Sequence, residues 1–164
     1  MFARNFPAYH PRKGEPTYFV EKIWASLGSS FLDQLADEER LFNPRLSLDV
    51  FNPKHHTVRS GNRFKVGDWF SPRVWSGKPY QSKQIIIAPD IQVKKVWLFE
   101  ISNTSHAIDG FLYNLNNLKE VAKNDGLEVA DFELWFKLKP GGRFVGQIIS
   151  WNDQIEYYYE TNQR

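Results

Sequence analysis

Apolar residues near the start of the chain recur at helical spacing. Phe19, Ile23 and Leu27 are four positions apart, so they fall on one face of a helix. Thr17 is a residue type that caps helix N-termini, and Gly28 is one that ends helices. The pattern therefore predicts an amphipathic helix from about Thr17 to Gly28.

A second, shorter helix is predicted directly after the first. Ser30 can act as its N-cap, because serine side chains accept hydrogen bonds from the first turn. Its apolar positions are Leu32, Leu35 and Ala36, and its acidic positions are Asp33, Asp37, Glu38 and Glu39. An acidic helix of this kind is also compatible with a protein-interaction domain.

From His55 onward the pattern changes to short segments with alternating polarity, which is typical of strands. The predicted strands are His55–Ser60, Trp69–Trp75, Gln84–Ile87, Ile91–Ile101 and, much later, Phe144–Trp151. Turn residues separate them at Val66-Gly67-Asp68, Gly77-Lys78-Pro79 and Pro89-Asp90.

Helical spacing returns before the last predicted strand. The apolar positions of this helix are Phe111, Leu115, Leu118 and Ala122, and Gly126 suits the position just past its end. A second short helix is predicted to carry Phe132, Trp135 and Phe136, and Gly141-Gly142 ends it.

Short central strands flanked by helices indicate an α+β fold, built on a small barrel or a strongly curved, mainly antiparallel sheet. The chain has 164 residues, of which 41% are hydrophobic, enough to form a real core. We therefore expect one domain over residues 1–164, with an extended lead-in at 1–16 and a tail at 152–164.

The composition excludes several kinds of site. Cysteine is absent, which rules out disulfides, zinc–thiolate centres and thiol nucleophiles. The histidines and carboxylates show no metal-ligand spacing, and no phosphate-binding glycine loop is present, so we expect no metal and no cofactor. No apolar run reaches the length of a signal peptide or membrane span, so we expect a cytoplasmic protein without a membrane partner.

Positive charge is concentrated in one part of the chain. Between Asn52 and Lys83 there are seven basic residues against one acidic residue, a local charge of +6, while the whole chain is only +2. Large aromatics are interleaved with these cations, an arrangement that suits pairing with phosphates and stacking on bases. The alternative is a basic strand face whose aromatics fill the core.

The segment from Trp75 to Gln84 is polar and basic, and Tyr80 is its one aromatic residue that we expect to be exposed. A loop of this kind can hold a phosphate while its aromatic ring stacks on a base, although it can equally be a solvated hairpin loop. The candidate residues for binding RNA, a nucleotide or a modified nucleoside are Arg59, Arg63, Arg73, Lys78, Tyr80 and Lys83.

Several pieces of the chain together resemble the ASCH family, a branch of the PUA-like proteins. The first is a Lys-x-x-Thr-x-Arg signature at Lys54, Thr57 and Arg59, followed by a Gly67-Asp68 turn. The second is the helix end Ala122–Leu127, which is similar to the family's Ala-x-x-Glu/Asp-Gly-Phe/Leu segment. A short aromatic helix and a final strand complete the order, so the resemblance spans roughly residues 17–151.

The resemblance implies a PUA-like small β-barrel flanked by short helices, with residues 28–51 as an insertion. It also implies a hydrolytic site, because some ASCH proteins are amidohydrolases that act on acylated cytidine nucleosides. The matching positions here are Lys54, Thr57 and Asp125. In such a site the amine deprotonates the threonine hydroxyl, the carboxylate orients the amine, and Arg59 holds an oxyanion or a phosphate.

Two functions of different classes therefore follow from the sequence. The first is binding of RNA or a modified nucleoside in a basic cleft beside the barrel. The second is a small amidohydrolase or ribonuclease that uses Lys54, Thr57 and Asp125. Both use the same part of the chain, so the sequence leaves the choice open. Asn52, which stands where the family signature begins with glycine, makes the catalytic loop less typical.

Overall fold

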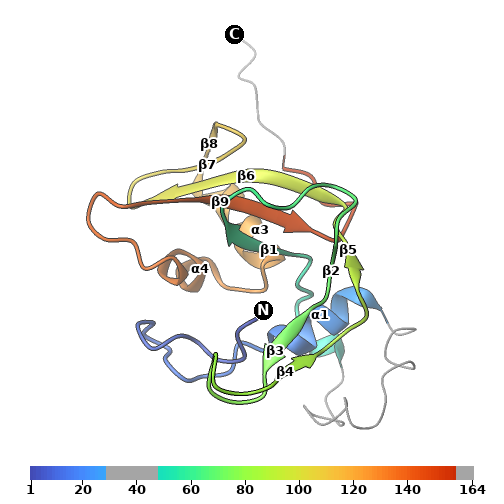
Figure 1. The fold of residues 1–164 in the computed structure, drawn as a ribbon. Helices are drawn as coiled ribbons and strands as arrows, with labels where there is room; N and C mark the ends of the chain where they lie inside the picture. The colour runs from blue at the N-terminus through green and yellow to red at the C-terminus, as the bar shows by residue number, and fades with distance from the viewer. Residues whose placement is uncertain (29–47, 158–164) are drawn as a thin grey trace. The chain divides into compact units, whose positions relative to one another are not determined.

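The computed structural model describes residues 1–28 and 48–157 (Figure 1). The acidic helix predicted from Ser30, most of the 28–51 segment and the last part of the tail lie outside these residues. The chain divides into two compact units, each assembled from two stretches of sequence. Unit 1 comprises Met1–His55 and Trp69–Ile91, and unit 2 comprises His56–Asp68 and Gln92–Arg164. The expectation of a single domain stays a prediction.

In unit 1, helix α1 spans Phe19–Leu27 and ends at Gly28, as the apolar spacing predicts. Gly28 has a φ of 87°, which a residue without a side chain adopts easily. Thr17 precedes the helix but is not its N-cap. Its Oγ1 accepts a hydrogen bond from the backbone N of Phe19 at 3.3 Å and donates one to the Ala3 carbonyl at 2.7 Å. Thr17 thus ties the start of α1 to the N-terminal segment.

A two-stranded antiparallel sheet completes the centre of unit 1. Strand β3 (Arg73–Trp75) pairs with β4 (Gln84–Ile86) so that Trp75 lies opposite Gln84. The N-terminal segment runs beside this hairpin, because the backbone N of Phe2 donates to the Arg73 carbonyl at 2.8 Å (Figure 1). Trp24 of α1 donates from Nε1 to the Ile87 carbonyl at 2.6 Å, so the helix is fixed to the strands by a buried polar contact.

The predicted strand Trp69–Trp75 is interrupted. The structure has β2 at Trp69–Phe70 and β3 at Arg73–Trp75. Ser71-Pro72 separates them, since proline has no N–H to continue a ladder. Strand β2 pairs with β5 (Ile91–Gln92). Earlier in the chain, a short 3₁₀ helix, η2, spans Leu48–Val50. The predicted strand Ile91–Ile101 is likewise divided, into β5 and β6 (Lys95–Ser102).

Unit 2 is built on a five-stranded antiparallel sheet in the order β1-β9-β6-β7-β8. The strands are β1 (His56–Ser60), β6 (Lys95–Ser102), β7 (His106–Ile108), β8 (Phe111–Tyr113) and β9 (Arg143–Ser150). The α+β class and the antiparallel sheet are therefore confirmed. Among residues 1–28 and 48–157 the sheet does not close into a barrel: β1 and β8 are its edges, and β3 and β4 pair with each other instead of extending it.

One face of this sheet carries the core of unit 2. Helix α3 spans Leu115–Asn124 and α4 spans Val129–Trp135, so the short aromatic helix predicted here is confirmed. Phe132 and Phe136 pack on Phe99 of β6, each with ring centroids 5.8 Å apart, and Phe136 lies 4.7 Å from Phe144 of β9. Aromatic pairs at these distances anchor α4 on the sheet.

The prediction of a helix beginning at Phe111 is wrong, because Phe111 lies in β8 and α3 begins only at Leu115. Asp109 and Gly110 have φ values of 49° and 84° and form the tight turn that joins β7 to β8. An Asp-Gly pair favours such a hairpin turn, since both positions need a positive φ. The local turn preference therefore overrides a helical spacing that extends by chance into the hairpin.

Gly146 allows β1 and β9 to approach closely. A Cβ placed on it would lie 2.2 Å from the Arg59 carbonyl oxygen and 2.8 Å from the Phe144 ring. No side chain fits at such distances, so glycine is required where β9 passes between the edge strand and its own aromatic neighbour.

Candidate functional site

The loop between β3 and β4 presents an aromatic side chain to solvent. The side chain of Tyr80 is 90% exposed, and its backbone φ is 63°, a conformation that costs a non-glycine residue about 1 kcal/mol. Its ring lies 5.3 Å from the ring of Trp75, at an interplanar angle of 52°. The half-buried Trp75 ring therefore lies beside the Tyr80 ring but covers little of its surface.

Hydrogen bonds within the loop fix its shape. The Oγ of Ser82 accepts from the backbone N of Gly77 at 3.0 Å and donates to the Lys78 carbonyl at 2.9 Å. The backbone N of Gln81 also donates to the Lys78 carbonyl, at 3.1 Å. At the base of the loop, the backbone N of Ser76 donates to the Lys83 carbonyl at 2.9 Å. Tyr80 thus projects from an internally bonded loop.

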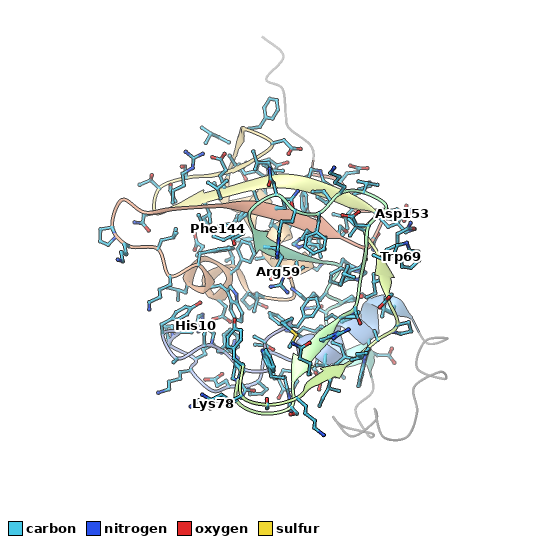
Figure 2. All side chains as sticks on the ribbon, in the orientation of Figure 1. His10, Arg59, Trp69, Lys78, Phe144 and Asp153 are labelled. Carbon is cyan, nitrogen blue, oxygen red and sulfur yellow. The ribbon has the colours of Figure 1, made fainter. Side chains whose placement is uncertain are left out.

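Predicted phosphate-binding residues occupy the same hairpin. Lys78 and Lys83 are exposed in the loop, and Figure 2 labels Lys78 there. Arg73 of β3 is half-buried, and its Nη1 donates to Oε1 of Gln84 at 3.2 Å. The structure thus brings three of the predicted cations into one hairpin with Tyr80. Arg63 is exposed in the connection that follows β1, in unit 2.

A groove adjoins the β3–β4 loop within unit 1. Its volume is about 530 Å³, and its walls are the N-terminal segment and the hairpin. The lining residues are Phe2, Ala3, Arg4, Asn5, Phe6, Pro7, Ala8, Lys13, Gly14, Trp75, Gly77 and Pro79. Nη1 of Arg4 donates to the Ser76 carbonyl at 3.4 Å, so one cation of the N-terminal segment is tied to the base of the loop.

Lys54 is buried, with only 1% of its surface exposed. Its Nζ lies 4.3 Å from the centroid of the Phe19 ring and 6.0 Å from that of Phe2, close enough for cation–π attraction. Its backbone N donates to the Lys22 carbonyl at 2.9 Å, which ties the segment before β1 to helix α1. Lys54 belongs to unit 1, whereas the other two predicted catalytic residues, Thr57 and Asp125, belong to unit 2.

Thr57 and Arg59 lie on the same face of β1. Thr57 pairs with Ile149 and Arg59 with Gln147, and residues two apart in a strand point to the same side. His56 points to the opposite face. Thr57 is buried as well, with 7% of its surface exposed.

Asp125 follows the last residue of α3 and is 7% exposed. Its Oδ1 lies 3.5 Å from Nδ1 of the fully buried His56. Burial lowers the pKa of Arg59, and the negative charge of Asp125 opposes this shift. The structure therefore brings Asp125 together with His56, on the face of β1 opposite to Thr57. The charge of Asp125 also acts on Arg59, which lies on the same strand as His56.

Tyr157 is a buried residue of this cluster that sequence reasoning missed. Its hydroxyl shares a hydrogen bond with Nε2 of His56 at 2.7 Å and accepts one from Nδ2 of Asn124 at 3.2 Å. Its ring packs edge-on against Trp97 at 5.0 Å. Burial raises the pKa of Tyr157 well above its ordinary value. The run Tyr157-Tyr158-Tyr159 is the only sequence signal that points to it.

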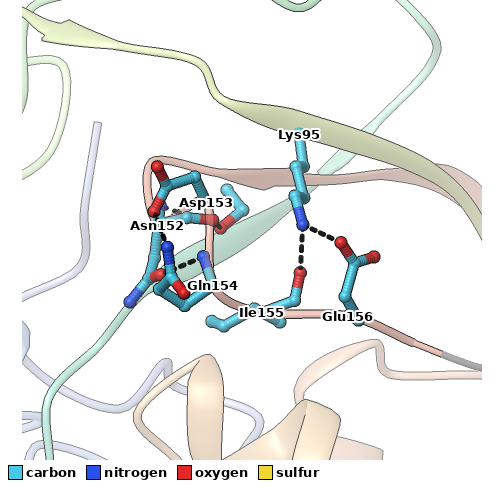
Figure 3. Close-up of polar contacts among 7 residues, drawn as sticks. Lys95, Asn152, Asp153, Gln154, Ile155 and Glu156 are labelled. Atoms are coloured by element: carbon cyan, nitrogen blue, oxygen red, sulfur yellow. Dashed lines mark hydrogen bonds and ion pairs between the residues drawn. The ribbon is translucent and has the colours of Figure 1, made fainter.

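The segment that leads to Tyr157 is fixed to β6 by Lys95 (Figure 3). Nζ of Lys95 donates to the Ile155 carbonyl at 2.9 Å and forms an ion pair with Glu156. Before it, the side-chain Oδ1 of Asn152 accepts from the backbone N of Gln154 at 2.7 Å, which makes a tight turn after β9. These contacts direct Tyr157 back onto the sheet.

Comparison with known proteins adds no relative: no family model, no curated protein and no solved structure matches the chain. Within residues 1–28 and 48–157, no helix is long and apolar enough to cross a membrane. In the same part of the chain, no three His, Asp or Glu side chains gather as a metal ion requires. By its fold, the part of the chain that the structure describes is an α+β protein with an open antiparallel sheet.

Proposed function

We propose that this protein binds single-stranded RNA or a nucleotide through the β3–β4 loop of unit 1. The observation that carries the proposal is the Tyr80 ring, which is 90% exposed, lies beside Trp75 and belongs to a residue in a left-handed backbone conformation. Residues with such backbone geometry are concentrated at binding sites, where the surrounding structure maintains them. Tyr80 provides the flat apolar surface on which a base stacks.

The charge of the hairpin supports the same ligand. Arg73, Lys78 and Lys83 surround Tyr80 in sequence and carry three positive charges, which suits the phosphates on either side of a stacked base. Stacking on an aromatic side chain contributes about 1–3 kcal/mol per base and depends little on which base is bound. The site thus combines a nucleobase contact with phosphate contacts, and neither contact depends on the RNA sequence.

Crosslinking tests where the RNA lies. Ultraviolet irradiation of the protein with a short oligouridylate, followed by peptide mapping, should attach the RNA to the peptide that contains Tyr80. Crosslinks confined to unit 2, for example around Arg63, would move the binding site away from the hairpin. Absence of any crosslink and of any retention of RNA would overturn the proposed function.

We further propose that the protein is a divergent relative of the ASCH family and that its open sheet is the counterpart of the PUA-like barrel. The order of elements supports this relation: the Lys-x-x-Thr-x-Arg signature leads into β1, the Ala122–Leu127 segment ends α3, and an aromatic helix precedes the last strand.

The second candidate function, hydrolysis of an acylated nucleoside by Lys54, Thr57 and Asp125, stays a prediction. Lys54 is 1% and Asp125 7% exposed, but they belong to different units. Asp125 contacts His56, on the face of β1 opposite to Thr57. Release of the free nucleoside from N-acylated cytidine, followed by chromatography, tests this candidate directly.

A further inference from the structure

The groove beside the β3–β4 loop has the composition of a site for a flat apolar group next to a phosphate. Phe2, Phe6 and Trp75 contribute to its walls together with three alanine or proline side chains of the N-terminal segment. Its volume of about 530 Å³ falls in the range of small-molecule sites, and it exceeds the volume needed for one nucleobase.

The charges along the groove have one sign. Arg4 and Lys13 line it, and none of the described residues that line it is acidic. The nearest acidic neighbour in sequence, Glu15, is paired with Nε of Arg12 at 2.8 Å. The guanidinium of Arg12 in turn lies 4.4 Å from the centroid of the Phe6 ring, so the Arg12–Glu15 ion pair packs against a residue that lines the groove. The groove therefore favours an anionic ligand.

The groove adjoins the loop that carries Tyr80. Trp75, Gly77 and Pro79 belong both to the loop region and to the lining of the groove. The Trp75 ring lines the groove, and its centroid lies 5.3 Å from that of the Tyr80 ring. A base on Tyr80 and a base in the groove are thus within reach of adjacent nucleotides.

We infer that the groove accepts the nucleobase next to the one that stacks on Tyr80, so that the site binds two adjacent nucleotides of a single strand. This inference rests on the proposed function and specifies its ligand. Arg4 and Lys13 then face the phosphate of the nucleotide in the groove. Because a base must leave its helical stack to enter the groove, the site selects single-stranded over double-stranded RNA.

The test fills the groove without altering the loop. Ala8 lines the groove and is exposed, so Ala8→Leu reduces the space while leaving Tyr80 and its cations in place. Ala130→Leu is the matched control, because Ala130 is exposed on α4 in unit 2. Affinities for uridine monophosphate, diuridylate and tetrauridylate are measured for the wild type and both variants by isothermal titration calorimetry.

In the wild type and in Ala130→Leu, affinity should rise at least about fivefold from the mononucleotide to the dinucleotide, as expected for one further base contact. In Ala8→Leu this rise should be lost, while mononucleotide binding stays within about twofold of wild type. As a second variant, Lys13→Gln keeps the groove open and should lower the slope of log affinity against log salt by about 0.7 for tetrauridylate.

The inference and the proposed function can fail separately. If wild type binds RNA through Tyr80 but Ala8→Leu and Lys13→Gln leave the dinucleotide affinity and salt slope unchanged, the groove does not hold a base and the inference is overturned. Equal affinity for duplex and single-stranded RNA would also overturn it. If wild type binds no RNA, the proposed function itself fails.

Discussion

The hydroxyl of Tyr157 lies 2.7 Å from Nε2 of His56, although 101 residues separate them in sequence. Asn124 donates to the same hydroxyl, and Asp125 lies beside the other nitrogen of the imidazole. The hydrogen bond therefore joins β1, the end of α3 and the segment after β9 in the interior of unit 2. Buried polar groups of this kind are costly to leave without a partner.

Removing this hydroxyl should destabilise the protein. Tyr157→Phe keeps the ring on Trp97 but removes the hydrogen bonds of its hydroxyl to Nε2 of His56 and to the Asn124 amide. We expect the free energy of unfolding to fall by about 1–3 kcal/mol, measured by urea denaturation at neutral pH. Tyr80→Phe is the control, because Tyr80 is 90% exposed, and it should change the free energy by less than about 0.5 kcal/mol. Equal effects of the two substitutions would contradict the role of Tyr157.

The raised pKa of Tyr157 predicts a dependence of stability on alkaline pH. The unfolded chain releases the phenol proton near pH 10, whereas the folded chain retains it, so the stabilisation is complete below pH 10 and is lost as pH rises. Wild type should lose up to about 1.4 kcal/mol per pH unit more than Tyr157→Phe above pH 10. Urea denaturation of both proteins between pH 8 and 11 measures this difference. Parallel pH profiles would contradict the burial of Tyr157.

RNA binding through the hairpin should be sensitive to its charge and to salt. In the double variant Arg73→Glu and Lys83→Glu, two cations of the proposed site become anions, so retention of RNA should be lost. For wild type, each phosphate neutralised should contribute about −0.7 to the slope of log affinity against log salt. Lys94→Glu with Lys119→Glu is the control, since both lysines are exposed in unit 2. A loss of binding in both double variants would indicate a general charge effect rather than a site.

The second candidate function makes a separate prediction. Because Lys54 is buried against Phe19, Lys54→Met preserves the packing better than alanine and should abolish hydrolysis of acylated cytidine with little loss of structure. Thr57→Val should also abolish hydrolysis, whereas Thr57→Ser should retain part of it, because serine keeps the hydroxyl. Chromatographic assays at neutral pH measure the rates. Equal rates for Thr57→Val and wild type would exclude a role for the threonine.

Local patterns in the sequence predicted the elements whose signal is local. The spacing of Phe19, Ile23 and Leu27 located α1, and alternation located β1 and β9. The helical spacing from Phe111 was misleading, since the Asp109-Gly110 turn places Phe111 in a strand. The sequence could not show that the sheet stays open instead of closing into a barrel, because the order of its strands depends on pairing between segments far apart in the chain.

The candidate site was predictable to a similar degree. The exposure of Tyr80 follows from its place in a polar turn-rich loop, and it could be expected from the residues around it. The adjoining groove depends on how the N-terminal segment packs beside the hairpin, which no local pattern reveals. The contact of His56 with Asp125 and Tyr157 likewise joins three distant segments.

The central claim is that Tyr80 stacks on a base of single-stranded RNA. The most direct measurement is the dissociation constant of a fluorescently labelled tetrauridylate for wild type, Tyr80→Phe and Tyr80→Ala, with Phe111→Ala as an exposed aromatic control in unit 2. We predict that Tyr80→Phe and Phe111→Ala bind within about twofold of wild type, and that Tyr80→Ala binds about 5- to 150-fold more weakly, the equivalent of 1–3 kcal/mol of stacking. An unchanged dissociation constant for Tyr80→Ala would contradict the claim.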